Sequence, residues 1–228
     1  MPAGFEDYVL LSQLQAAEIM KYTVEHLRRD SEYCSGVIIW QLNDCWPVIP
    51  CSAVDYNGRW KALQYYKKRF FAPVLISARD EGTRVQLWVS NERREPFDGN
   101  VEWQLADARG AELRSGRLPV TAAAGQSRAC ASLDFTDLVT AGNRDRVCLF
   151  CRLLSGAADI GAGTVLFVLP KDFHFERPQI NATSRTAATG TRSASGRTAS
   201  PSPSSSTRGP ATASSLTTGW MCHPAGPG

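Results

Sequence analysis

Along the first 75 residues, apolar side chains follow a helical period, then form an unbroken run, and then return to a helical period. The first stripe consists of Leu10, Leu14, Ala17, Val24 and Leu27. This spacing predicts a helix that Asp7 caps and that ends in the basic pair at 28–29. The apolar run at 36–40, flanked by glycine and polar residues, is typical of a strand buried on both faces. A second helix is expected over 58–71, before Pro73. The order helix, buried strand, helix indicates part of an α/β sheet or barrel.

From residue 76 onward the apolar positions alternate with more polar ones. Val85, Leu87 and Val89 begin this pattern. Similar short runs follow at 101–106, 111–118, 127–135, 147–154 and 164–169. About six or seven short strands, separated by Gly, Asn and Asp turns, predict an immunoglobulin-like antiparallel β-sandwich.

The end of the chain differs in composition from the rest. Of the last 47 residues, 38 are Ser, Thr, Ala, Gly or Pro. Such a segment cannot bury enough apolar surface to offset the entropy lost on ordering. We therefore expect a low-complexity, disordered tail over 179–228.

Composition and charge narrow the possible functions. With 228 residues, 43% of them apolar and 21% charged, the chain has ordinary globular composition, which excludes collagen, coiled coil and wholesale disorder. The net charge of +3 comes from four arginines in the tail, since residues 1–181 carry 21 basic and 22 acidic side chains. The basic pI therefore gives no reason to expect a nucleic acid partner. We also expect no membrane span and no signal peptide, and the seven sparse cysteines indicate reduced thiols in a cytoplasm.

The stretch at 40–48, WQLNDCWPV, follows the predicted buried strand and has the side chains of a sugar-binding loop. Active sites of (β/α)8 barrels lie at the carboxyl ends of the strands. Trp40 offers a rigid apolar face for the C–H side of a sugar ring, while Asn43 and Asp44 can hydrogen-bond sugar hydroxyls. In the alternative, Trp40 fills a barrel core and Asp44 caps the next turn.

The segments around this stretch resemble the end of the catalytic barrel of β-mannosidases, which belong to the retaining glycoside hydrolase family 2. The resemblance rests on WQLNDCWPV at 40–48, DYNGRWKALQYY at 55–66 and RFFAP at 69–73, without gaps. YVLLSQLQAAE at 8–18 resembles the seventh barrel helix, so the strand at 36–40 would be the eighth. The alternating region resembles the sandwich domain that follows the barrel, and LFVLPKDF at 166–173 resembles its exit.

The resemblance implies a fold in three parts. These are an incomplete (β/α)8 barrel end (helix, last strand, helix) over 1–75, an immunoglobulin-like β-sandwich over 76–178 and the tail over 179–228. A whole barrel needs about 200 or more residues, so the barrel part is expected to expose Ile38 and Trp40 and to depend on a partner. That partner would be the missing N-terminal part of the barrel, supplied by a separate chain if the protein works by complementation.

The implied activity is removal of terminal β-D-mannose from oligosaccharides and glycoconjugates with retention of configuration. This chemistry uses two carboxyl groups about 5 Å apart, and no cofactor or metal. In the family both are glutamates, on barrel strands four and seven, whereas this chain is expected to begin after strand seven. We therefore expect no catalytic residue here and no activity of the chain alone.

Two glutamates mimic the catalytic motifs without their context. The dipeptide at 91–92, Asn-Glu, resembles the acid/base motif but falls between two sandwich strands, where a turn is expected. Glu32 follows a serine, as the nucleophile does, but it lies in the loop that enters the eighth strand, on the opposite face of the barrel from the active site. Neither is taken as catalytic.

The resemblance and the loop chemistry together assign substrate binding to Trp40, Asn43, Asp44 and Trp46, with Trp40 as the sugar platform and Trp46 at the pocket mouth. The expected ligand is a β-mannoside oligosaccharide. The chain departs from the usual family pattern at Cys51, where an aromatic residue is expected.

Other interpretations concern the sandwich. A non-catalytic module could bind carbohydrate or mediate contacts, with Trp88 and Trp103 as candidate stacking residues, although both are better explained by packing. Cys148 and Cys151 have the C-x-x-C spacing of zinc sites, but residues three apart on a strand face opposite sides. We expect them to be core thiols.

Overall fold

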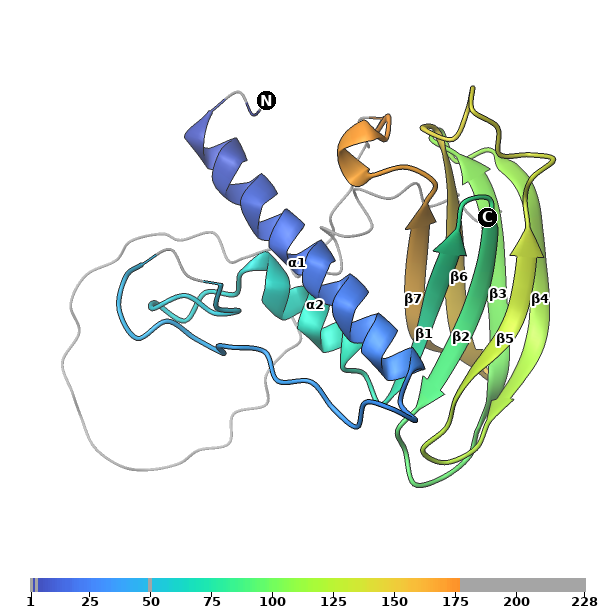
Figure 1. Ribbon diagram of the computed structural model, residues 1–228, viewed down its shortest axis with the longest axis horizontal. Helices are drawn as coiled ribbons and strands as arrows, with labels where there is room; N and C mark the ends of the chain where they lie inside the picture. Colours follow the sequence, from blue (N-terminus) through green and yellow to red (C-terminus); the bar gives the residue numbers. More distant parts are fainter. Residues whose placement is uncertain (1, 3, 49–50, 177–228) are drawn as a thin grey trace, which may run out of the picture. The chain divides into compact units, whose positions relative to one another are not determined.

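The computed structural model describes residues 2, 4–48 and 51–176 (Figure 1). The tail expected over 179–228 lies outside these residues. The helices are α1 (Phe5–Arg29) and α2 (Ala62–Phe70), and the strands are β1 (Val74–Glu81), β2 (Arg84–Asn91), β3 (Phe97–Asp107), β4 (Glu112–Ala122), β5 (Ser127–Asp134), β6 (Val147–Ser155) and β7 (Ala158–Leu166), followed by the 3-10 turn η1 (Pro170–Asp172).

Helix α1 confirms the predicted helix, but it begins earlier than expected, and of the predicted apolar stripe only Ala17 and Val24 are buried. Its N-cap is Gly4, with no side-chain cap, so the prediction that Asp7 caps the helix is wrong. Asp7 instead lies in the first turn, where its negative charge favours the helix dipole. The helix ends at Arg29, as the basic pair at 28–29 predicted.

The two helices pack side by side and run in the same direction. Their common core contains Ala17, Val24, Ala53, Leu63 and Phe70. Tyr66 Oη donates to Glu18 Oε1 at 2.7 Å, and Arg28 Nη1 donates to the carbonyl of Phe70 at 2.5 Å. Residue numbers therefore rise together along both helices, the arrangement of consecutive helices in a βα repeat.

The predicted buried strand at 36–40 is not a strand among the described residues. Residues 35–39 form neither helix nor strand, and they make no backbone hydrogen bond to another described segment. A parallel strand needs neighbouring strands on its edges, and the described residues supply none. Val37 and Ile39 pack on the helical core, whereas Ile38 and Trp40 are 95% and 83% exposed. The expected exposure of Ile38 and Trp40 is thus confirmed.

The remaining strands form two antiparallel sheets, with strand orders β1-β2-β5 and β4-β3-β6-β7. The predicted inward positions Val85, Leu87 and Val89 are fully buried in the sandwich core. The sequence pattern missed β1 entirely. It also placed the last strand at 164–169, whereas β7 begins six residues earlier, because its glycines interrupt the apolar alternation.

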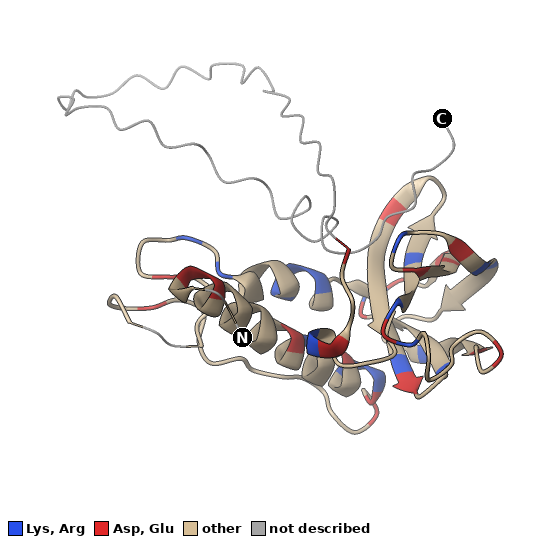
Figure 2. Ribbon diagram, turned by 90° about the horizontal axis from the view of Figure 1, so that it is seen from above, with Lys and Arg blue, Asp and Glu red and all other residues tan. Residues whose placement is uncertain are grey.

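The C-terminal part of α1 joins the helical segment to the sandwich. It packs against β1, β2 and β5. Tyr22 Oη donates to Asp80 Oδ1 at 2.8 Å, and Arg29 Nη1 donates to the carbonyl of Ala78 at 3.1 Å. Met1–Phe175 accordingly form one compact unit. Figure 2 shows basic and acidic positions interspersed along the helices and strands of this unit.

Candidate functional site

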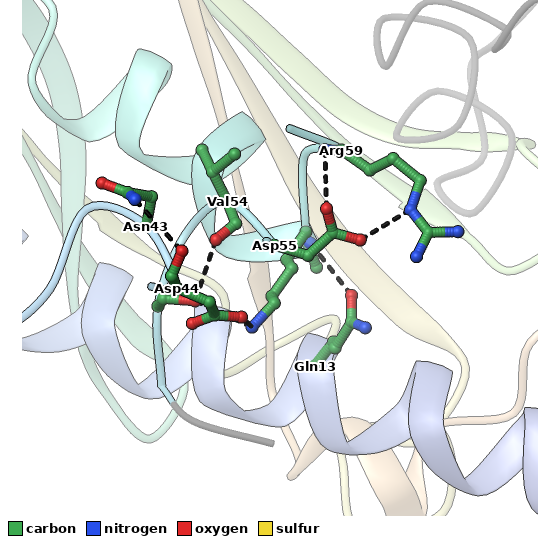
Figure 3. Close-up of polar contacts among 9 residues, drawn as sticks. Gln13, Asn43, Asp44, Val54, Asp55 and Arg59 are labelled. Carbon is green, nitrogen blue, oxygen red and sulfur yellow. Dashed lines mark hydrogen bonds and ion pairs between the residues drawn. The ribbon is translucent and has the colours of Figure 1, made fainter. Parts of the chain in front are cut away.

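The loop between residues 40 and 61 is held in shape by its own backbone (Figure 3). Val54 N–H donates to the carbonyl of Leu42 at 2.9 Å, and Asp44 N–H donates to the carbonyl of Val54 at 3.0 Å. Lys61 N–H donates to the carbonyl of Ala53 at 3.0 Å. These bonds tie the part of the loop after Trp40 to the part just before α2.

A buried ion pair lies under the loop. Lys61 Nζ is 2.8 Å from Asp44 Oδ2 and donates to Ser52 Oγ, also at 2.8 Å. The side chains of Asp44 and Lys61 are only 1% and 15% exposed. Desolvation would raise the pKa of Asp44, but hydrogen bonds from Lys61 and Ser52 outweigh it and lower that pKa below its ordinary value. Asp44 is therefore a carboxylate engaged with the protein.

A second ion pair closes the outer turn of the loop. Arg59 Nε lies 2.6 Å from Asp55 Oδ2, and Arg59 N–H donates to Asp55 Oδ1 at 2.8 Å. The backbone hydrogen bond from Arg59, with its side-chain bond, lowers the pKa of Asp55. Gly58, at φ 81°, supplies the left-handed residue that this turn needs. A shallow depression of about 240 Å³ adjoins the turn, lined by Asp44, Pro47, Val48, Asp55, Tyr56, Asn57 and Arg59.

The loop divides the four predicted substrate-binding residues into two kinds. Trp40 and Trp46 are 83% and 63% exposed, and Asn43 is also exposed, so a ligand can reach all three. Asn43 Nδ2 donates to the carbonyl of Asp44 at 3.2 Å. Asp44 itself is buried, and its carboxylate lies 2.8 Å from Lys61 Nζ.

The sequence pattern did not identify Lys61 as part of this site. Lys61 lies 17 positions after Asp44 along the chain. No helical or strand period brings residues at that separation together, and only the folded loop does so. The only sequence feature that could have pointed to Lys61 was a charged residue at the start of a predicted helix. That feature is too common to identify a site residue.

The two glutamates that mimic catalytic motifs have other surroundings. Glu92 lies directly after β2, as the predicted turn required, and its Oε1 is 2.8 Å from Nε of the buried Arg28. Glu32 lies in the exposed turn that follows α1. The side chain of Asn91 is tied to its own loop, since Nδ2 donates to the carbonyl of Glu95 at 2.8 Å.

The sandwich tryptophans pack within the protein. Trp103 packs against the sandwich core, 5.7 Å from Phe135 in an edge-on ring contact. Trp88 is half-buried on the outer face of its sheet, beside the buried Ser77. Neither is presented as an open stacking platform, as the packing interpretation predicted.

The two cysteines of β6 lie in the protein interior. Cys148 and Cys151 are buried in two different apolar clusters, which confirms the prediction from strand alternation. The described part of the chain contains no group of three potential metal ligands. None of its helices is both long and apolar enough to cross a membrane.

The described residues form an immunoglobulin-like sandwich joined to a pair of parallel helices, and similarity to β-mannosidases supports a module of glycoside hydrolase family 2. Residues 83–172 match the Mannosidase Ig/CBM-like domain.

Relatives with similar sequences are β-mannosidases. β-Mannosidase B of Aspergillus niger is 34% identical over 126 residues, which are 48% of this chain and 15% of that protein. β-Mannosidase A of Aspergillus terreus is 32% identical over 127 residues, 53% of this chain and 14% of that protein. The chain thus spans about 15% of the length of these relatives.

Solved structures share the fold. A β-D-mannosidase from Dictyoglomus thermophilum matches with a TM-score of 0.70 and 24% identity, over 78% of this chain and 21% of its own. The exo-chitosanase CsxA of Amycolatopsis orientalis matches with a TM-score of 0.59 and 18% identity, over 72% of this chain and 20% of its own. The sandwich makes up less than half of the chain, so the shared fold extends into the helical segment.

Proposed function

We propose that residues 1–75 are the last α/β unit of a (β/α)8 glycosidase barrel, and that the whole enzyme is a retaining exo-β-mannosidase. It would remove terminal β-D-mannose from oligosaccharides and glycoconjugates. The observation that carries the proposal is the alternation over 37–40, where two apolar side chains pack on the helices and the next ones along the chain face away from them.

That alternation fits a barrel strand whose neighbours are missing. In such a barrel one face of each strand meets the surrounding helices and the other fills the interior. Val37 and Ile39 contact the helical core, so Ile38 and Trp40 would face the barrel interior and the active site. The parallel direction of α1 and α2 on either side of the segment supports the same arrangement.

The sugar would be held by the exposed face of the loop. Trp40 stacks on the mannose ring, Trp46 borders the pocket, and Asn43 hydrogen-bonds a hydroxyl group. The catalytic acid/base and nucleophile are carboxyl groups from the rest of the barrel, about 5 Å apart. The 228-residue chain alone is inactive, and it recovers function only together with a polypeptide that supplies the other seven strands.

Two measurements test this proposal. The purified 228-residue chain is incubated with a chromogenic aryl β-D-mannoside, and no hydrolysis is expected. Turnover that disappears in Glu92→Gln or Glu32→Gln would refute the proposal, because a carboxylate of this chain would then be catalytic.

The second measurement is binding of methyl β-D-mannoside to the same chain. Trp40→Ala is expected to abolish binding, while the matched control Tyr33→Ala leaves it unchanged, because Tyr33 is 92% exposed and lies outside the loop. Loss of binding in Trp88→Ala, with binding retained in Trp40→Ala, would favour a carbohydrate-binding sandwich instead.

A further inference from the structure

The exposed indoles of the loop have little support of their own. Trp40 and Trp46 make no aromatic contact among the described residues, and most of each side chain is exposed. Their orientation is therefore set by the loop backbone rather than by packing around the rings. Whatever holds that backbone also determines where the two rings point.

Lys61 holds both arms of the loop. Its Nζ contacts Asp44 on the first arm and Ser52 on the second, each at 2.8 Å, and its own N–H bonds the carbonyl of Ala53 at 3.0 Å. Asp44 lies between the two tryptophans along the chain, and its N–H bonds the carbonyl of Val54. The carboxylate, the ammonium group and the two backbone bonds therefore form one connected network.

The burial of this pair distinguishes it from the other ion pair of the loop. Asp44 and Lys61 are 1% and 15% exposed, whereas Arg59, the partner of Asp55, is 77% exposed. Removing one member of a buried pair leaves an uncompensated charge, whereas breaking a solvated pair has little effect. The loop should thus respond to the loss of Lys61 and tolerate the loss of Arg59.

We infer that Lys61 is a positioning residue: through Asp44 it fixes the loop backbone and thereby the orientation of the Trp40 and Trp46 indoles toward the sugar. The part of this inference that concerns sugar contact rests on the proposed function. The part that concerns the ordering of the loop backbone by Lys61 does not depend on it. Asp44, predicted from sequence to bind substrate, would act through the loop rather than by touching the sugar.

The first measurement follows the loop without any sugar. Amide hydrogen exchange is recorded for Asp44, Val54 and Lys61 in the 228-residue chain and in Lys61→Met. Exchange at these amides is expected to rise at least about tenfold in the variant, while amides of β2 and β6 keep their protection and show that the sandwich is folded. Unchanged exchange at the loop would overturn the inference.

The second measurement is the affinity for methyl β-D-mannoside. Lys61→Met is expected to weaken binding at least about fivefold, Lys61→Arg to restore most of it because a cation is returned to Asp44, and the matched control Arg59→Met to leave it unchanged. Equal loss in Lys61→Met and Arg59→Met would overturn the positioning role. Absence of binding by the unsubstituted chain would refute the sugar contact of the proposed function, and loop exchange would then decide on Lys61 alone.

Discussion

Arg28 is the side chain through which α1, α2 and the sandwich meet, and replacing it by methionine should loosen that junction. The residue is 7% exposed, its Nη1 donates to the carbonyl of Phe70 at 2.5 Å, and its Nε lies 2.8 Å from Glu92. Burial lowers the pKa of Arg28, because desolvation disfavours the charged guanidinium, and the nearby Glu92 acts in the opposite direction. Methionine keeps the apolar stem but removes both polar contacts.

The magnitude follows from the surroundings of each contact. The carbonyl of the buried Phe70 loses its donor, which costs about 1–3 kcal/mol. The ion pair contributes less, at most about 1 kcal/mol, because the side chain of Glu92 is 61% exposed. Arg28→Met should therefore lower the free energy of unfolding by about 1–3 kcal/mol, and Glu92→Gln by less than about 1 kcal/mol.

Urea unfolding with hydrogen exchange of the α2 amides measures this effect. Loss of protection is expected in α2 first, with the sandwich amides retained. The matched control is Arg79→Met, since Arg79 forms a largely exposed pair with Glu81 and should change stability by no more than about 0.5 kcal/mol. The reasoning fails if Arg28→Met is no more destabilising than Arg79→Met, or if Glu92→Gln costs as much as Arg28→Met.

Three further predictions concern the sandwich and the thiols. Gly116→Ala should destabilise the chain by about 1–3 kcal/mol in urea unfolding, because the new Cβ would lie 2.6 Å from the Trp103 ring. NMR titration of Asp134 should give a pKa of about 2, below its ordinary 3.8, so its stabilising effect should be complete above about pH 4 and be lost as the pH falls through about 2. Alkylation at pH 8, mapped by mass spectrometry, should modify the exposed Cys45 and spare Cys151, whose pKa burial raises to about 12.

Each of these predictions has a control within the chain. Gly161→Ala adds the same methyl group where no atom lies within 4 Å, so its stability should stay close to that of the unsubstituted chain. Thr136→Ala should raise the pKa of Asp134, since Thr136 supplies the largest contribution to its lowering. Full modification of Cys151 in the folded chain would contradict its burial, and equal effects of the two glycine substitutions would contradict the packing at Trp103.

The sequence predicted those structural features that depend on residues close together along the chain. The inward positions of β2 followed from simple alternation, and the end of α1 followed from its last basic turn. β1 was missed because only its first half is largely buried, so the second half reads as a polar segment. The local spacing of apolar residues predicts a strand only when one face is buried along its whole length. The prediction fails for a strand such as β1, where burial changes from one half to the other.

The candidate site shows the same limit for polar contacts. Residue type and position at the end of an apolar run identified Trp40 and Asn43 as accessible loop residues, and both are exposed. The burial of Asp44 could not be predicted, because it depends on Lys61 from beyond the loop's second turn. The local sequence, an aspartate between two tryptophans, is the same whether the carboxylate faces a sugar or a lysine.

The segment at 36–40 connects these two limits. Its apolar sequence predicts burial on both faces, yet only Val37 and Ile39 find an apolar contact within the described residues. The run pairs with no strand, and Ile38 is 95% exposed. Its apolar composition suits a strand with neighbours on both edges, and the described residues do not contain those neighbours. Under the proposed function those neighbours are the first and seventh strands of the barrel. Pairing with them would bury Ile38, place Trp40 beside the catalytic carboxylates, and bring the loop clamped by Lys61 to the rim of the active site.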